Sequence, residues 1–275
     1  MTLQDLNKIT DNFRTTQKMP VLFIGHGSPM NAIEENEFVR GWRSIAQTVP
    51  HPQAILCVSA HWETKGTFVT AMEKPQTIHD FGGFPRELYS IRYPAPGSPE
   101  LAAGVVDMVK SVNVEPDMKW GLDHGCWSVV KHMFPEADVP VIQMSLDHFR
   151  SPGYHYELAR ELSSLREKGI LILGSGNLVH NLGQVAWNRL DDIGFGYDWA
   201  LEANDKMKEF ILKGDHKSLI DYKSQGQAFN LAIPTPDHFL PILYTLALKE
   251  GDEQITFYND KAVAGSLTMT CVKIG

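Results

Sequence analysis

The stretch VLFIGHGSPM (Val21–Met30) gives the clearest indication of the fold, because four apolar residues run directly into the turn-forming sequence GHGSP. This pattern is typical of a buried parallel strand that ends in a tight loop. A second apolar run, QAILCVSA at residues 53–60, ends in the same way at His61. Apolar residues at helical spacing in 36–49 lie between the two runs, so the sequence predicts a β-α-β unit.

The rest of the chain continues this alternation of strands and helices. We predict further buried strands at 139–146 and 169–176, helices at 98–112, 151–169 and 238–251, and edge strands at 254–260 and 266–275. The sequence therefore predicts a single α/β catalytic domain over residues 1–275, with residues 1–18 as a peripheral segment. Its mostly parallel central sheet is flanked by helices, and the active site is expected at the carboxyl ends of the strands, where ligands bind in open α/β sheets.

Composition narrows the class of partner. The chain has 275 residues, is 43% hydrophobic and carries a formal net charge of -8 without a cluster of Lys and Arg, which argues against nucleic acid and anionic membranes as partners. The N-terminus lacks the apolar core of a signal peptide, so we expect a cytoplasmic protein that acts on a small molecule. Cys57, Cys126 and Cys271 are odd in number and lack CxxC spacing, which argues against disulfides and a cysteine zinc site.

The placement of the histidines is the unusual feature of this sequence. Eleven are present, and five of them follow predicted strands or sharp breaks in the chain. These five are His26, His61, His124, His180 and His238. Because the carboxyl ends of parallel strands meet at one edge of a sheet, we expect the five side chains to converge on one cleft. The remaining histidines, except His79, are expected to have structural roles.

Several other functions were weighed for these motifs. GHGSP completes neither nucleotide-binding fingerprint, and Ser28 precedes Pro29 rather than standing in a GxSxG elbow. The HxE of His61 and Glu63 resembles part of a zinc deaminase signature, but the chain has no PCxxC. Glu63 as a ligand and Glu63 as an orienting partner both remain open. The long Gly-, Pro- and aromatic-rich segment 75–99 suggests a lid over an apolar ligand.

Seven motifs then occur in one order along the chain: FIGHGSPMNAIEEN, VSAHWET, TIHDFGGFP, YPAPGSPELA, WGLDHGCW, GSGNLVHNL and IPTPDHFLPILY. Together they closely resemble the 4,5-DOPA extradiol dioxygenases of the class III ring-cleaving dioxygenase superfamily. The resemblance spans essentially the whole chain after its first twenty residues or so. It implies a single α/β domain with one mononuclear non-haem metal site.

By this resemblance, His26, His61 and His238 are the expected metal ligands. His180 matches the acid/base histidine beside the metal, which is sometimes counted as a fourth ligand, and His124 matches a second pocket histidine that positions substrate and oxygen. We further expect three residues of the long loop to bind substrate: His79, Asp80 and Phe81. The superfamily commonly has a glutamate as third ligand where this chain has His238, which leaves the identity of the metal open.

The implied reaction is extradiol cleavage of a catechol such as 3,4-dihydroxyphenylalanine by O₂. One divalent metal ion is expected per chain: iron(II) for turnover, because zinc has no redox chemistry, and zinc(II) in the protein as isolated. Two alternatives remain, a tetrapyrrole metal chelatase and a zinc-holding relative that binds phenols without turnover. The sequence leaves open the natural catechol, the choice between the 4,5 and 2,3 bonds, and whether the chain forms a homo-oligomer.

Overall fold

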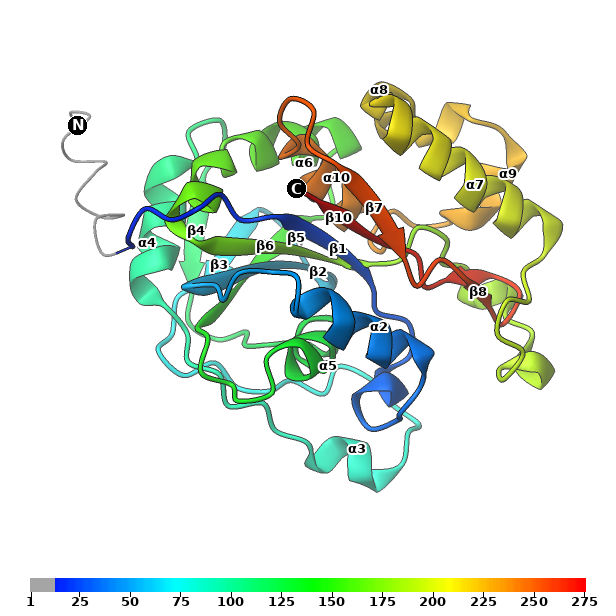
Figure 1. Ribbon diagram of the computed structural model, residues 1–275, viewed down its shortest axis with the longest axis horizontal. Helices are drawn as coiled ribbons and strands as arrows, with labels where there is room; N and C mark the ends of the chain where they lie inside the picture. The colour runs from blue at the N-terminus through cyan, green and yellow to red at the C-terminus, as the bar shows by residue number, and fades with distance from the viewer. Residues whose placement is uncertain (1–12) are drawn as a thin grey trace.

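A computed structural model describes residues 13–275. Its main sheet has eight strands in the order β4-β3-β5-β2-β6-β1-β10-β7 (Figure 1). The strands are β1 Val21–Gly25, β2 Ala54–Thr64, β3 Thr67–Thr70, β4 Val114–Asp117, β5 Val141–Asp147, β6 Ile170–Gly176, β7 Ile255–Tyr258 and β10 Cys271–Ile274. Strands β5, β2, β6 and β1 form a parallel centre, and a separate ribbon pairs β8 (Ala262–Val263) with β9 (Leu267–Thr268).

Helices cover both faces of this sheet. They are α2 Glu37–Ala46, α3 Arg86–Ser90, α4 Pro99–Met108, α5 His124–Met133, α6 Pro152–Arg160, α7 Asp198–Lys213, α8 His216–Ile220, α9 Gln227–Ala232 and α10 Leu240–Ala247. Figure 1 shows α2 and α5 below the sheet and α6, α7 and α10 above it. Alternate residues of β1 enter the two cores, Val21 and Phe23 on the α10 side and Leu22 and Ile24 on the α2 side, as expected for a strand buried on both faces.

The predicted fold class is confirmed: the chain forms an α/β domain with a mostly parallel sheet between helical layers. Some boundaries differ from the prediction. The helix expected at 151–169 breaks into α6 and a 3-10 helix at Ser163–Lys168, which ends at Gly169 with a left-handed φ of 69°. The strand expected at 266–275 divides into β9 and β10. Strand β10 is an interior strand, because it pairs with β1 on one side and β7 on the other.

The predicted peripheral segment at 1–18 lies mostly outside the described residues. Within the described part, Thr16 donates its backbone N–H to Glu167 at 2.8 Å, and Lys18 pairs with Glu250 at 2.6 Å. All three cysteines are buried and are not joined in disulfides. None of the helices in the described range is both long and apolar enough to cross a membrane.

Candidate metal centre

The loop after β1 holds His26 close to its neighbours. Gly25 allows the chain to pass against β10, since a Cβ there would lie 2.6 Å from the backbone of Met269. His26 donates its backbone N–H to Gly176 at 3.1 Å, which ties the loop to the end of β6. Ser28 then caps the short helix at Pro29–Ala32, so the chain turns away from the sheet. The result is a 2% exposed histidine at the carboxyl end of β1.

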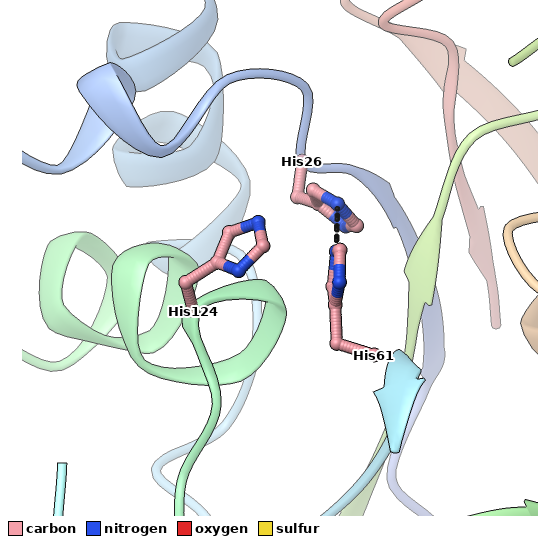
Figure 2. A group of neighbouring side chains, drawn as sticks. All are labelled: His26, His61 and His124. Atoms are coloured by element: carbon pink, nitrogen blue, oxygen red, sulfur yellow. Dashed lines mark hydrogen bonds between the residues drawn. The ribbon is translucent and has the colours of Figure 1, made fainter. Parts of the chain in front are cut away.

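The five histidines named above do converge. His61 lies near the end of β2, His124 is the first residue of α5, and His180 and His238 lie in the segments after β6 and before α10. The Nε2 atoms of His26 and His61 are 3.0 Å apart, and Figure 2 shows His124 beside this pair. The ring centroid of His238 is 5.3 Å from that of His26 and 4.9 Å from that of His61. The rings of His180 and His238 stack at 3.5 Å.

Within residues 13–275, two groups of side chains are compact enough to hold a metal ion. The first is His26, His61 and His124, and the second is His180, Asp237 and His238; within each, the potential ligand atoms lie within 4.8 Å of one another. Of the three predicted ligands, His26 and His61 belong to the first group and His238 to the second. The two groups are neighbours, because the ring centroid of His238 lies 5.3 Å from that of His26 and 4.9 Å from that of His61. The geometry thus brings all five histidines into one cluster.

Hydrogen bonds on the Nδ1 atoms orient the rings. Ser175 Oγ donates to the carbonyl of Gly125 at 2.6 Å and lies 3.0 Å from Nδ1 of His26, so it accepts the Nδ1–H. Nδ1 of His238 donates to the Asp237 carboxylate. In both rings the proton therefore sits on Nδ1, and Nε2 carries a lone pair. Such partners fix the tautomer of metal-binding histidines, so this donor set fits a divalent ion.

Burial keeps three imidazoles of the cluster, those of His26, His61 and His180, neutral. Burial, reinforced by the other histidines, holds the pKa values of His26 and His61 well below the usual range. Burial and the neighbouring His238 lower the pKa of His180 to about 3. Although burial opposes it, the bond to His238 holds the pKa of Asp237 well below its usual range. The cluster therefore combines three neutral rings with an ionised carboxylate beside His238, which suits the binding of a cation.

His180 differs from the other four histidines. Its ring is almost parallel to that of His238, with an interplanar angle of 5°. One ion cannot lie in the planes of two rings stacked in this way. Among the described residues, neither ring nitrogen of His180 has a hydrogen-bond partner, although its backbone N–H donates to Ala232 at 2.9 Å. The ring is thus free to exchange a proton, which fits an acid/base better than a fourth ligand.

The three predicted loop residues are placed differently from one another. Asp80 binds the ring of His124, with Oδ2 2.8 Å from Nδ1, and the Phe81 ring lies 5.5 Å from that of His124. His79 faces away, with Nε2 3.1 Å from the carbonyl of Ile91. Glu63 belongs to neither ligand group; burial and the nearby Asp237 carboxylate raise its pKa.

The residues that support the cluster were not predicted from the sequence. Ser175 and Asp237 hold His26 and His238, yet their only signals were a strand-end serine and adjacency to a histidine. Asp123 is fully buried: its Oδ1 accepts from Ser59 Oγ at 2.7 Å and from the N–H of Cys126 at 3.1 Å, and its Oδ2 accepts from Gln143 at 2.7 Å. It thereby joins β2, β5 and the start of α5.

The chain is similar to a known family and to several known proteins. Residues 20–269 match the family described as the catalytic LigB subunit of aromatic ring-opening dioxygenase. The chain is 44% identical to the 4,5-DOPA dioxygenase extradiol of Escherichia coli (strain K12), over 97% of this chain and 98% of that protein. The protein of the same name from Beta vulgaris is 37% identical, over 84% and 85% of the two chains. The crystal structure of an uncharacterized Escherichia coli K12 protein superposes with a TM-score of 0.81 at 41% identity, covering 94% of this chain and 100% of that one.

Proposed function

Because the chain belongs to the LigB family of aromatic ring-opening dioxygenases, we propose that it opens the ring of a catechol such as 3,4-dihydroxyphenylalanine with O₂, by extradiol cleavage at the 4,5 bond. The names of the relatives from Escherichia coli and Beta vulgaris support this substrate. The observation that carries the proposal is the meeting of buried imidazoles at the carboxyl edge of the sheet, with hydrogen bonds that leave Nε2 of His26 and of His238 unprotonated. A tetrapyrrole chelatase loses support, since the family match covers residues 20–269.

We assign His26, His61 and His238 as the ligands of one divalent ion. Zinc and iron ligated by histidine lie about 2.0–2.1 Å from each nitrogen, so two ligand nitrogens are about 3 Å apart, close to the 3.0 Å between His26 and His61. When bound, iron(II) supplies the redox chemistry that O₂ needs and a Lewis acid for the catechol oxygens. The same histidines would also hold zinc(II), which we expect in the protein as isolated.

His180 is the residue to accept a proton from the catechol. A catechol chelates a metal through its adjacent oxygens only after losing at least one proton, and a neutral imidazole next to the ligands can take it. His180 is neutral, stacks on His238 and keeps its ring nitrogens unbonded among the described residues. The same ring can return the proton later in the reaction.

His124 and Phe81 complete the proposed pocket. The His124 ring is 3.9 Å from that of His61, so its Nε2, which has no hydrogen-bond partner among the described residues, can accept a hydrogen bond from a group bound beside the metal ligands. Phe81 packs edge-on to His124 and offers an apolar face to the catechol ring. We assign His124 to positioning substrate and oxygen, and Phe81 to binding the ring.

Anaerobic loading with iron(II), followed by 3,4-dihydroxyphenylalanine and then O₂, tests the function. We expect one O₂ consumed per catechol and a yellow semialdehyde product, with iron but not with zinc. His180→Gln should lower kcat by about 100-fold or more while retaining iron, since general acid–base groups contribute about 10²–10⁴-fold. His51→Gln, at an exposed histidine outside the cluster, should match the wild type. Iron-loaded protein that consumes no O₂ with any catechol would instead indicate the zinc-holding relative.

A further inference from the structure

The carboxylate of Asp80 touches two histidines of the cluster at once. Its Oδ1 accepts the backbone N–H of His124 at 2.8 Å, and its Oδ2 lies 2.8 Å from Nδ1 of the same residue. Oδ2 also lies 3.5 Å from Nδ1 of His61. The carboxylate is 15% exposed and the His124 side chain 6% exposed, so water competes little for these contacts.

Both oxygens of Asp80 are thus occupied by N–H groups of the protein. His124 is the first residue of α5, whose backbone N–H has no acceptor within the helix. Asp80 satisfies that N–H and the ring Nδ1–H together, while Asp123 caps the N–H of Cys126. A carboxylate used in this way has little capacity left for a substrate group.

The loop around Asp80 is attached to the same region of the structure. Ile78 donates its N–H to Leu122 at 2.7 Å and accepts from Nε1 of Trp127 at 2.8 Å. Beyond Phe81, by contrast, the loop reaches open space: a Cβ added at Gly82 or Gly83 would meet nothing within 4 Å. Asp80 and Phe81, which both contact His124, are therefore the last packed residues of the loop before its glycines.

We propose that Asp80 is a positioning residue, whose single carboxylate fixes the rings of His124 and His61 so that their Nε2 atoms face the metal centre. This inference rests on the proposed function for its kinetic consequences, and it replaces the expectation that Asp80 binds substrate. By accepting Nδ1–H, Asp80 selects the tautomer of His124 that leaves Nε2 unprotonated. Phe81, the next residue, is placed against His124 by the same contact.

Asp80→Asn is the sharpest test, because an amide has one acceptor oxygen and Asp80 accepts two N–H groups of His124. One of these groups must lose its partner. We expect kcat to fall about 10–100-fold, the range for partners of metal-site histidines, with KM within about twofold. Glu87→Gln, an exposed carboxylate of the same loop, is the matched control and should change neither constant. A tenfold rise in KM at unchanged kcat would show a substrate contact and overturn the proposal.

A second measurement does not depend on activity. In metal-free wild type, ¹⁵N–¹H spectra of the histidine rings should show His124 protonated at Nδ1, and Asp80→Asn should shift this ring toward Nε2 protonation. Wild type with His124 protonated at Nε2 would overturn the proposal. If the wild type cleaves no catechol, the proposed function fails, yet this spectrum still decides the role of Asp80. Should Asp80→Asn not fold, Asp80→Glu, which keeps both acceptors, is expected to retain the wild-type tautomer.

Discussion

Replacing Asp237 tests how strongly the carboxylate beside His238 sets the affinity of the proposed metal site. Asp237 accepts the Nδ1–H of His238 and is ionised, with a side chain that is 17% exposed against 9% for the histidine. In Asp237→Asn the amide oxygen can still accept this bond, although without charge. In Asp237→Ala no acceptor is left for the buried N–H.

The two variants should therefore weaken metal binding to different degrees. A hydrogen bond to a charged group is worth about 1.5–3 kcal/mol and a neutral one about 0.5–1.5 kcal/mol. Losing only the charge costs about 1 kcal/mol, so Asp237→Asn should raise the metal Kd about 5–10-fold. Losing the whole bond costs about 2 kcal/mol or more, so Asp237→Ala should raise Kd about 30–100-fold, consistent with other partners of metal-bound histidines.

Competition between the metal-free protein and a zinc chelator measures these constants, and thermal unfolding checks them. At a zinc concentration 100 times the wild-type Kd, binding stabilises the wild type by about 2.7 kcal/mol, and a 100-fold weaker variant by only about 0.4 kcal/mol. Glu63→Gln is the matched control: this carboxylate acts on Asp237 through its charge but lies in neither ligand group. Wild-type affinity in Asp237→Ala would refute the reasoning, and so would equal weakening by Glu63→Gln.

Three further substitutions each remove or disturb one contact of a buried group, so their effects on zinc affinity or on stability can be predicted. In Gly125→Ala, the new Cβ would lie 2.6 Å from Ser59 Oγ and 2.9 Å from His61 Cδ2, so the His61 ring must shift. We expect zinc affinity to fall about tenfold while the circular dichroism spectrum stays unchanged. Gly82→Ala is the control, because its Cβ would lie in open space, and it should leave zinc affinity unchanged. Ser175→Ala leaves the buried Nδ1–H of His26 without its acceptor, and urea denaturation should show a loss of about 1–3 kcal/mol. Glu253→Gln leaves Arg166, 1% exposed, without its carboxylate, and should cost about 3 kcal/mol. Although burial opposes it, Arg166 lowers the pKa of Glu253 to about 2. The stabilisation by the Arg166–Glu253 ion pair is therefore complete above about pH 5 and declines as pH falls toward 2. A wild-type free energy of unfolding that stays constant between pH 5 and pH 2 would contradict this role of the ion pair.

The fold was predictable where burial alone decides the pattern. The central strands are buried on both faces, so each appears in the sequence as a short apolar run. Ser98 and Pro99 begin α4 as their residue types indicate. Strands β3 and β4 were not predicted, because neither forms an apolar run: β3 (TFVT) has two apolar residues, and β4 (VEPD) has one besides its proline. The start of α5 depends on contacts of Asp123 with two other strands, which no local pattern reveals.

The site was predictable in its members but not in their orientation. His26, His61 and His180 lie at or after the ends of strands, which must gather at one edge of a parallel sheet. His124 and His238 were included because they follow sharp breaks in the chain, and the structure places them at the starts of helices beside the same edge. The direction of each ring depends on partners distant in sequence, such as Ser175 for His26, 149 residues away, and Asp80 for His124, 44 residues away. The stacking of His180 on His238 likewise joins segments that the sequence keeps apart.

These partners bear on the question of the metal. In the superfamily that the sequence resembles, a glutamate commonly stands where this chain has His238, so direct ligation by three imidazoles brings no negative charge. Here the charge lies one ring further out, on Asp237 behind His238 and on Asp80 behind His124 and beside His61. A carboxylate that accepts the Nδ1–H raises the basicity of the opposite nitrogen. With His26, His61 and His238 as the proposed ligands, these two carboxylates would supply part of the electrostatic stabilisation that a ligating glutamate gives a divalent ion.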